Sequence, residues 1–140
     1  MTGALKAVHY CLSDIGRRRE ENQDAWFADP GAGLFLVSDG MGGLAAGGLA
    51  SKAAAEIFPK MLGEKLLALA KRTSKAVQAA LREALAEFSA GLREKGEETP
   101  RLGGMGATVA AALIEGRCLY IAHLGDSRAY LLSNGKLQRL

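Results

Sequence analysis

Three aspartates of this chain lie where their side chains could bind a metal ion together. Asp24, Asp39 and Asp126 each fall at the end of an expected strand or beside a glycine. Carboxylates at strand ends can converge, and Gly40 would let a backbone carbonyl approach the same ion. Hard divalent cations such as Mg²⁺ and Mn²⁺ prefer oxygen ligands in octahedral geometry, with water at the remaining positions. The pattern favours a Mg²⁺ or Mn²⁺ site, while each aspartate taken singly could instead cap a turn.

An arginine near the first of these carboxylates suggests what such a metal site would do. Arg19 precedes Asp24 by five residues, across a short polar loop that also contains Asn22. A guanidinium beside a carboxylate-bound metal can hold a phosphate group with two parallel hydrogen bonds. A metal together with an arginine therefore predicts phosphoryl chemistry.

The glycine-rich segment 40–48 leaves a second interpretation open. Gly40, Gly42 and Ala45 follow an expected strand and precede an expected helix, as in the loose form of the dinucleotide-binding fingerprint. A nucleotide-binding fold would place a parallel strand with an acidic end after that helix, whereas the next long segment here is a second amphipathic helix. A dinucleotide-binding domain is therefore the weaker alternative.

The elements that must position these residues begin with strands. Alternating side-chain character over 5–12 predicts a half-buried strand. Two short apolar runs, 25–28 and 33–38, are joined by turn-forming residues at 29–32, which predicts a hairpin. The second strand of this hairpin would carry Asp39 at its tip.

Two helices are expected after the glycine-rich loop. The first begins at about Leu49, and Pro59 should end or kink it. The second is the clearest helix of the sequence, since Thr73 or Ser74 can cap it. Its apolar residues recur at helical spacing: Val77, Leu81, Ala84, Leu85, Phe88 and Leu92.

Antiparallel strands are expected after a loop at 96–106. The candidate strands are 108–114, 118–123, 127–132 and 136–140, with a strong hairpin signal at Asn134 and Gly135. Strands, then two helices, then strands is an α+β pattern with an antiparallel sheet. The last strand runs to the final residue, so we expect a truncated domain whose unfinished sheet edge could support self-association.

Length and composition are those of one soluble globular domain. The chain has 140 residues, of which 49% are hydrophobic and 24% charged. No run reaches the roughly 20 apolar residues of a membrane span, and no secretory signal pattern is present, so we expect a cytoplasmic protein without membrane partners. The net charge of +3 is too small and diffuse to indicate nucleic acid. Cys11 and Cys118 are expected to be small buried hydrophobes.

Four stretches of the sequence resemble the bacterial form of the PPM, or type 2C, metal-dependent protein serine/threonine phosphatases. They occur in the order of that family, cover nearly the whole chain, and are specific when taken together. The four are Ser13-Asp14-Ile15-Gly16 through Arg19, Asn22 and Asp24; Val37-Ser38-Asp39-Gly40-Met41-Gly42-Gly43; Gly104-Met105-Gly106-Ala107-Thr108; and His123-Leu124-Gly125-Asp126-Ser127-Arg128-Ala129-Tyr130.

The resemblance implies an αββα fold, in which two antiparallel sheets form a sandwich with helices on both outer faces and two metal ions at one end. It implies that Asp39 bridges both metals, that the Gly40 carbonyl binds one, and that Asp24 acts near the first metal through water. Asp126 would serve a third, weaker site, and Arg19 would bind the substrate phosphate. The implied reaction is hydrolysis of phosphoserine and phosphothreonine in proteins by metal-activated water. The implied partners are a phosphorylated protein and a protein kinase.

Departures from the family pattern limit these expectations. Met41 stands where many members carry a histidine proposed as proton donor, so no general acid is assigned. Family members supply two further metal-binding aspartates from a C-terminal half. Residues 1–140 are therefore expected to be the N-terminal portion of a single phosphatase domain, with little or no activity alone. A non-catalytic phosphatase-like binding module remains the alternative from another class.

Overall fold

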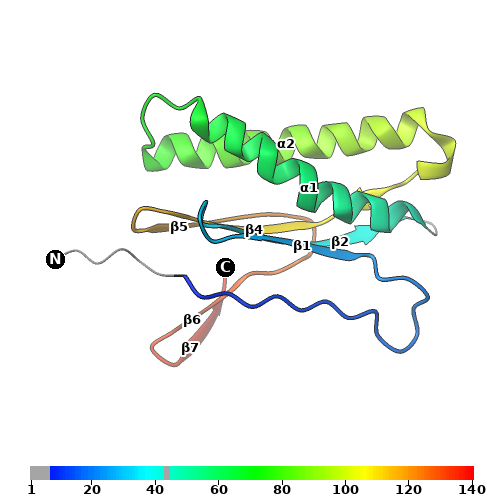
Figure 1. Cartoon of the computed structure of the whole chain (residues 1–140), viewed down its shortest axis with the longest axis horizontal. Coiled ribbons are helices and arrows are strands. Elements are labelled where there is room, and N and C mark those ends of the chain that lie inside the picture. Colours follow the sequence, from blue (N-terminus) through cyan, green and yellow to red (C-terminus); the bar gives the residue numbers. More distant parts are fainter. Residues whose placement is uncertain (1–6, 43–44) are drawn as a thin grey trace.

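The computed structural model describes residues 7–42 and 45–140. It contains a layer of two helices over one face of an antiparallel sheet, with a separate hairpin beyond the other face (Figure 1). The expected α+β class with antiparallel strands is confirmed. The elements are β1 Asp24–Asp29, β2 Leu34–Met41, α1 Ala45–Leu67, α2 Ser74–Glu98, a short 3-10 helix Pro100–Leu102, β3 Gly106–Ala107, β4 Val109–Glu115, β5 Cys118–Leu124, β6 Tyr130–Ser133 and β7 Lys136–Arg139.

The main sheet places segments from both halves of the chain side by side. Its order is β1-β2-β4-β5, and the short β3 pairs with the tip of β2. The hairpin of β1 and β2 forms as expected, with antiparallel pairing from Asp24 opposite Asp39 to Asp29 opposite Leu34. Because β2 also pairs with β4, the strand that ends near Asp39 is held on both sides.

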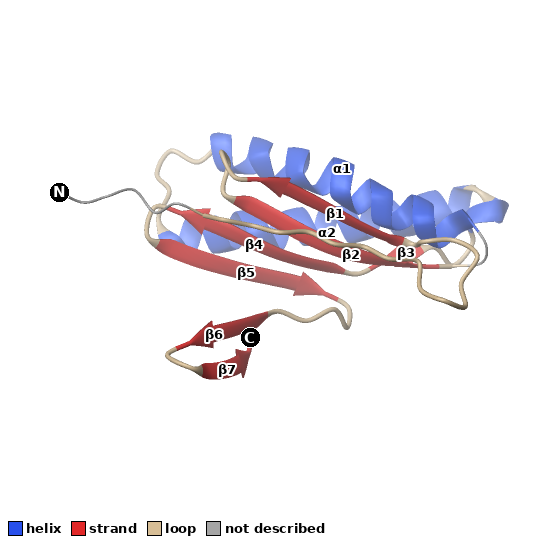
Figure 2. Cartoon of the chain, turned by 60° about the horizontal axis from the view of Figure 1, so that its bottom comes forward, coloured by secondary structure: helices blue, strands red, loops and turns tan. Residues whose placement is uncertain are grey.

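The core lies between this sheet and the two helices. Alternate residues of β2 face the helices, so Leu34 and Leu36 are buried while Val37 is 52% exposed on the opposite face. Phe58 of α1 and Phe88 of α2 meet edge to face with ring centroids 6.3 Å apart, and both are buried. This packing fixes the helix layer over the sheet, as Figure 2 shows from another side.

The other face of the sheet carries no helix among the described residues. The chain from residue 7 onward crosses this face instead (Figure 2), and the His9 ring lies 5.3 Å from that of Phe35. The strand expected at 5–12 is wrong for residues 7–12, which form no strand, and residues 5 and 6 lie outside the described part. The physical reason is that this segment lies across the sheet, where no described strand offers it hydrogen-bond partners.

Helix α1 differs from its expected bounds. It begins at Ala45 and includes Gly47, so the predicted loop to residue 48 is too long, and it continues through Pro59 to Leu67. A proline inside a helix costs about 3 kcal/mol. The buried apolar stripe of the helix offsets this cost, because it packs on the sheet on both sides of the proline; its members are Ala46, Ala50, Ala54, Phe58, Leu62 and Leu66.

Other local expectations had mixed outcomes. Helix α2 forms as predicted, and the Ala76 N–H donates to the Thr73 hydroxyl at 3.2 Å, which identifies Thr73 as the cap. Asn134 and Gly135 both adopt positive φ in the turn between β6 and β7. The expected burial of the cysteines is wrong, because Cys11 and Cys118 are both exposed. Among the described residues, no helix is both long and apolar enough to cross a bilayer.

Candidate metal centre

Asp24 and Asp39 lie directly opposite each other at one rim of the sheet. They are partners in the register of β1 and β2, and both side chains are exposed. Partial burial raises the pKa of Asp39, the nearby carboxylates of Asp24 and Asp126 raise it further, and the Arg19 guanidinium lowers it. The structure therefore places Asp24 beside Asp39, with Arg19 and Asp126 near enough to affect the charge of Asp39. The roles of the aspartates as metal ligands and of Arg19 as a hydrogen-bond donor to the substrate phosphate remain predictions.

The backbone of Asp39 is held by Thr108, which lies directly before β4 in the chain. The Thr108 N–H donates to the Asp39 carbonyl at 2.8 Å, and the Asp39 N–H donates to the Thr108 hydroxyl oxygen at 2.9 Å. The same hydroxyl bonds the hydroxyl of Ser127, the residue after Asp126. The Ser38 hydroxyl donates to the Thr108 carbonyl at 2.6 Å. Thr108 thus connects the segments that carry Asp39 and Asp126.

Sequence reasoning did not assign a function to Thr108 or Ser127. The signal was available, since both residues lie inside stretches that carry the family resemblance. The contact of Thr108 with Asp39 depends on β2 meeting the start of β4, which local sequence patterns do not show.

Two glycines allow α1 to approach the tip of β2 closely. A side chain at Gly40 would overlap the Gly47 carbonyl oxygen, and a Cβ at Gly47 would lie 2.9 Å from the Gly40 oxygen and 2.6 Å from Gln23 Oε1. The Gly40 N–H donates to the Gln23 carbonyl at 2.9 Å. The Gly40 carbonyl is the predicted backbone ligand of the metal. It lies between Gln23, the residue before β1, and the first turn of α1.

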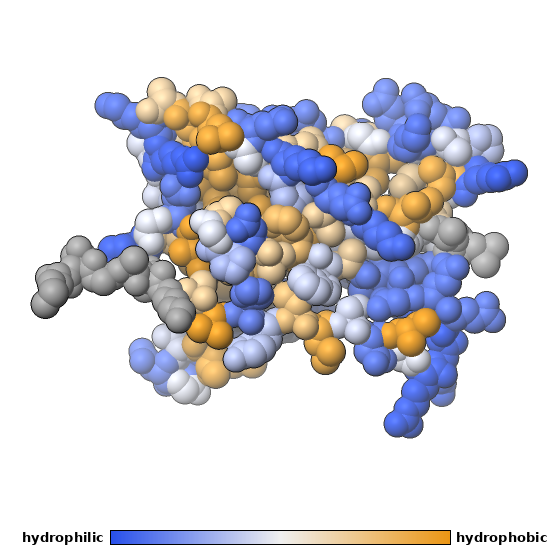
Figure 3. All heavy atoms as spheres, viewed as in Figure 1, coloured by the Kyte–Doolittle hydropathy of each residue, from blue (hydrophilic) through white to orange (hydrophobic). Residues whose placement is uncertain are grey.

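Arg19 lines a cleft together with Asp39. The cleft also includes Gly40, Met41 and the acidic side chain of Glu20. Hydrophilic side chains gather at this end of the molecule, at the lower right of Figure 3, where the chain before β1 loops outward. A phosphate group in this cleft could contact the guanidinium and lie beside the Asp39 carboxylate.

The Arg19 loop is shaped by the polar residues of its motif. The Gly16 N–H donates to Asp14 Oδ1 at 2.7 Å, and Gly16 has a φ of 75°, which favours glycine. The Asn22 side chain donates to the Ser13 hydroxyl at 2.8 Å and accepts from the Asp24 N–H at 3.0 Å. Asn22 therefore joins both ends of the loop to the strand that begins at Asp24.

The donor set fits part of the shell of a hard divalent cation. Asp24 and Asp39 offer adjacent carboxylate oxygens, whose mutual repulsion a cation would relieve. Within residues 7–42 and 45–140, however, no group of three or more His, Cys, Asp or Glu side chains is placed to hold a metal. Mg²⁺ commonly retains several waters and uses one or two carboxylates, so these residues fit such an ion only with water completing its shell.

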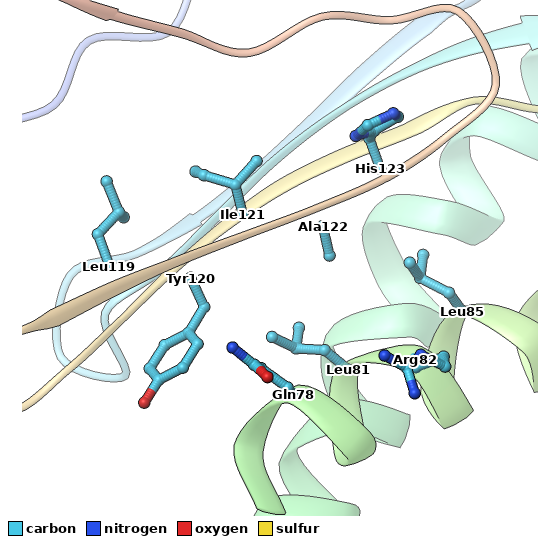
Figure 4. A pocket seen from close by; sticks show the side chains of 9 residues that line it. All are labelled: Gln78, Leu81, Arg82, Leu85, Leu119, Tyr120, Ile121, Ala122 and His123. Carbon is cyan, nitrogen blue, oxygen red and sulfur yellow. The ribbon is translucent and has the colours of Figure 1, made fainter. Parts of the chain in front are cut away.

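A different concave surface lies at the open edge of β5, beside α2. Figure 4 shows that Tyr120 and Ala122 point toward α2, whereas Leu119, Ile121 and His123 point to the opposite side of the strand. Gln78 and Arg82 of α2 supply polar groups there. No carboxylate lines this surface, so it lacks the donors that the rim near Asp39 provides.

Comparison with known proteins identifies the family. The model of the family described as protein phosphatase 2C matches residues 16–140. The chain belongs to this family. The dinucleotide-binding alternative also requires a parallel strand–helix–strand unit, whereas every strand pair in the described residues is antiparallel.

Two of the similar proteins are bacterial phosphatases that are longer than this chain. It is 39% identical over 132 residues to the serine/threonine protein phosphatase PstP of Mycobacterium tuberculosis, covering 91% of this chain and 23% of that protein. It is 33% identical to the serine/threonine phosphatase stp of Listeria monocytogenes, covering 91% of this chain and 51% of the relative. The chain thus spans about a quarter of the first protein and half of the second.

Solved structures show the same fold. The catalytic domain of PstP in complex with two manganese ions has a TM-score of 0.74 and 35% identity, covering 92% of this chain and 52% of that one. The serine/threonine phosphatase Stp1 from Staphylococcus aureus also has a TM-score of 0.74, with 28% identity over 91% of this chain and 50% of its own.

Proposed function

We propose that this chain supplies the N-terminal part of a site that hydrolyses phosphoserine and phosphothreonine in proteins with Mn²⁺ or Mg²⁺. The observation that carries the proposal is the placement of Asp24 opposite Asp39 at a rim where Arg19 and Asp126 also act on Asp39. Membership of the protein phosphatase 2C family supports it. The manganese ions in the related PstP structure support the choice of metal.

Each side chain has a distinct role in this proposal. Asp39 would hold the metal ions with the Gly40 carbonyl beside it, and Asp24 would act near the first ion through water. Arg19 holds two oxygens of the substrate phosphate from the cleft that it shares with Asp39. Asp126 serves a third, weaker metal site. When bound, the metal supplies a water of lowered pKa that can attack phosphorus near neutral pH.

Residues 1–140 are proposed to be one portion of a single phosphatase domain and to be weakly active or inactive without the remainder. The support is twofold. The described residues contain no set of three metal-binding side chains, and the chain spans only about half of the related phosphatase structures. With few protein ligands, most of the metal's coordination shell would be water, so Mn²⁺ should bind weakly.

Titration with Mn²⁺ tests the proposed site directly. Calorimetry should detect weak binding by the 140-residue chain, and Asp39→Asn should abolish it. Asp29→Asn is the matched control, because it removes the same charge from the opposite end of the same hairpin. If the chain does not bind Mn²⁺, or if both variants lose binding equally, the metal site is wrong.

Hydrolysis of p-nitrophenyl phosphate tests the proposed incompleteness. We expect little turnover with Mn²⁺. Robust turnover that Asp39→Asn abolishes would show that the residues present suffice for catalysis. The non-catalytic module predicts neither metal binding nor turnover.

A further inference from the structure

The cleft lined by Arg19 and Asp39 is called the phosphate cleft below. An apolar groove adjoins it on the side of α2. It is formed by the C-terminal part of α2, by the segment that leads through β3 to Thr108, and by Leu124 at the end of β5 with Gly125 and Asp126 after it. Figure 1 shows the end of α2 above the chain that returns into β4. This groove is distinct from the concave surface at the β5 edge in Figure 4, which is lined by residues nearer the N-terminus of α2.

The groove and the phosphate cleft share one lining residue. Met41 lines both of them, and Asp126 lines the groove while belonging to the proposed metal rim. A peptide whose phosphorylated residue enters the cleft beside Arg19 and Asp39 would therefore have neighbouring residues within reach of the groove.

Glycines form much of the groove's lining, and methionines border it. A Cβ at Gly106 would lie 2.6 Å from the terminal methyl of Met41, so this side chain lies close against the glycine backbone. A Cβ at Gly96 of α2 would lie 3.4 Å from Met105 Cγ. The glycines let the methionine side chains lie against the backbone, and unbranched, polarisable methionines adapt to guests of different shape.

The charges around the groove disfavour an acidic guest. Arg93 and Glu97 of α2 offer one charge of each sign, and Asp126 adds a carboxylate at the end nearest the metal rim. Leu92 and Leu124 contribute apolar surface between them. An uncharged apolar side chain would bury surface here without leaving a carboxylate beside Asp126.

We propose that this groove binds an apolar side chain of the phosphoprotein substrate, close in sequence to the phosphorylated residue. The proposal rests on the proposed phosphatase function and adds a substrate preference to it. The occupant is an extended segment of the substrate itself, because the groove adjoins, at Met41, the cleft where the substrate's phosphate would lie.

The test uses peptides that carry a non-hydrolysable phosphonate in place of phosphoserine. One series has glycine at every flanking position, and matched peptides place a single leucine at successive positions on either side. With the chain in excess Mn²⁺, at least one leucine peptide should bind about five- to tenfold more tightly than the glycine peptide. Met41→Ala and Met105→Ala should reduce this ratio, whereas Leu67→Ala, at an exposed position of α1, should not.

Methyl NMR provides a readout that does not depend on a variant's stability. With diamagnetic Mg²⁺ in place of Mn²⁺, the leucine peptide should shift the methyl resonances of Met41 and Met105 more than the glycine peptide does, and it should leave that of Met61 in α1 unchanged. Methyl shifts that are the same with both peptides would overturn the proposal.

Two failures can be told apart. If all peptides bind equally and Arg19→Ala weakens all of them, the phosphate site stands and the groove proposal is wrong, including the case in which another segment covers the groove. If no phosphonate peptide binds in Mn²⁺, the proposed function fails and the groove proposal fails with it.

Discussion

Thr108 and Asp39 hold each other through two hydrogen bonds. The Thr108 N–H donates to the Asp39 carbonyl, and the Asp39 N–H donates to the Thr108 side chain. In a regular sheet the Asp39 N–H would donate to a backbone carbonyl of the neighbouring strand, and here the Thr108 hydroxyl takes that place. The position of the central carboxylate therefore depends on a hydroxyl 69 residues further along the chain.

Replacement of this hydroxyl should weaken both the fold and the metal site. Thr108→Val keeps the side-chain shape but leaves the Asp39 N–H without its acceptor, which should cost about 1–3 kcal/mol in the free energy of unfolding. Mn²⁺ affinity should fall as well, because Asp39 loses its fixed position. Urea unfolding and calorimetric titration measure the two effects. Thr108→Ser keeps the hydroxyl and should retain most of the Mn²⁺ affinity; an equal loss in both variants would contradict this role.

Asp39→Asn should stabilise the chain in the absence of metal. Burial and the neighbouring carboxylates raise the pKa of Asp39 above its ordinary value of 3.8, so its ionised form is disfavoured in the folded state. The folded state then holds protons more tightly than the unfolded state, and the contribution of Asp39 to stability falls as pH rises from 3.8 through the raised pKa. In EDTA, the variant should melt at a higher temperature than the wild type near neutral pH.

Two conditions should remove or reverse that difference. Below pH 3.8 both proteins carry an uncharged side chain at position 39, so their melting temperatures should converge. Excess Mn²⁺ should favour the wild type, because only it retains the carboxylate proposed to bind the metal. A variant less stable than the wild type in EDTA at neutral pH would show that Asp39 ionisation does not oppose folding.

Arg19→Ala should weaken phosphate binding by about tenfold or more, because it removes charge-assisted hydrogen bonds. NMR titration of the Mg²⁺-loaded chain with inorganic phosphate provides the affinity, because Mg²⁺ is diamagnetic and leaves the resonances near the site observable. Arg17→Ala is the matched control, since it removes an equal charge from the same exposed loop without lining the cleft. Equal weakening in the two variants would indicate general electrostatic attraction and not a phosphate contact by Arg19.

Features set by neighbouring residues were predictable from the sequence. The turn at 29–32 joins β1 to β2 and so places Asp24 opposite Asp39. Thr73 and the apolar spacing after it define α2, and Asn134-Gly135 define the last turn. In each case the signal and the structure lie within one element or one hairpin.

Features set by tertiary packing were not predictable in the same way. Pro59 lies inside α1 because the buried stripe around it holds the helix on the sheet, and residues 7–12 lack a strand because no described strand pairs with them. Thr108 reaches Asp39 only because β2 pairs with β4. The carboxylate pair could thus be inferred from a hairpin, whereas the residue that holds it required the whole sheet.

Two glycine substitutions in α1 should have opposite effects on stability. Gly47→Ala would place a methyl group against Gln23 and the Gly40 carbonyl, so it should cost about 1–3 kcal/mol through overpacking. Gly63→Ala meets no atom within 4 Å and replaces a flexible helical residue, so it should stabilise by about 0.5–1 kcal/mol. Urea unfolding measures both. Because Gly47 also fixes the Gly40 carbonyl beside Asp39, Gly47→Ala should lower Mn²⁺ affinity while Gly63→Ala leaves it unchanged; equal affinities would show that the close approach of α1 to β2 serves packing alone.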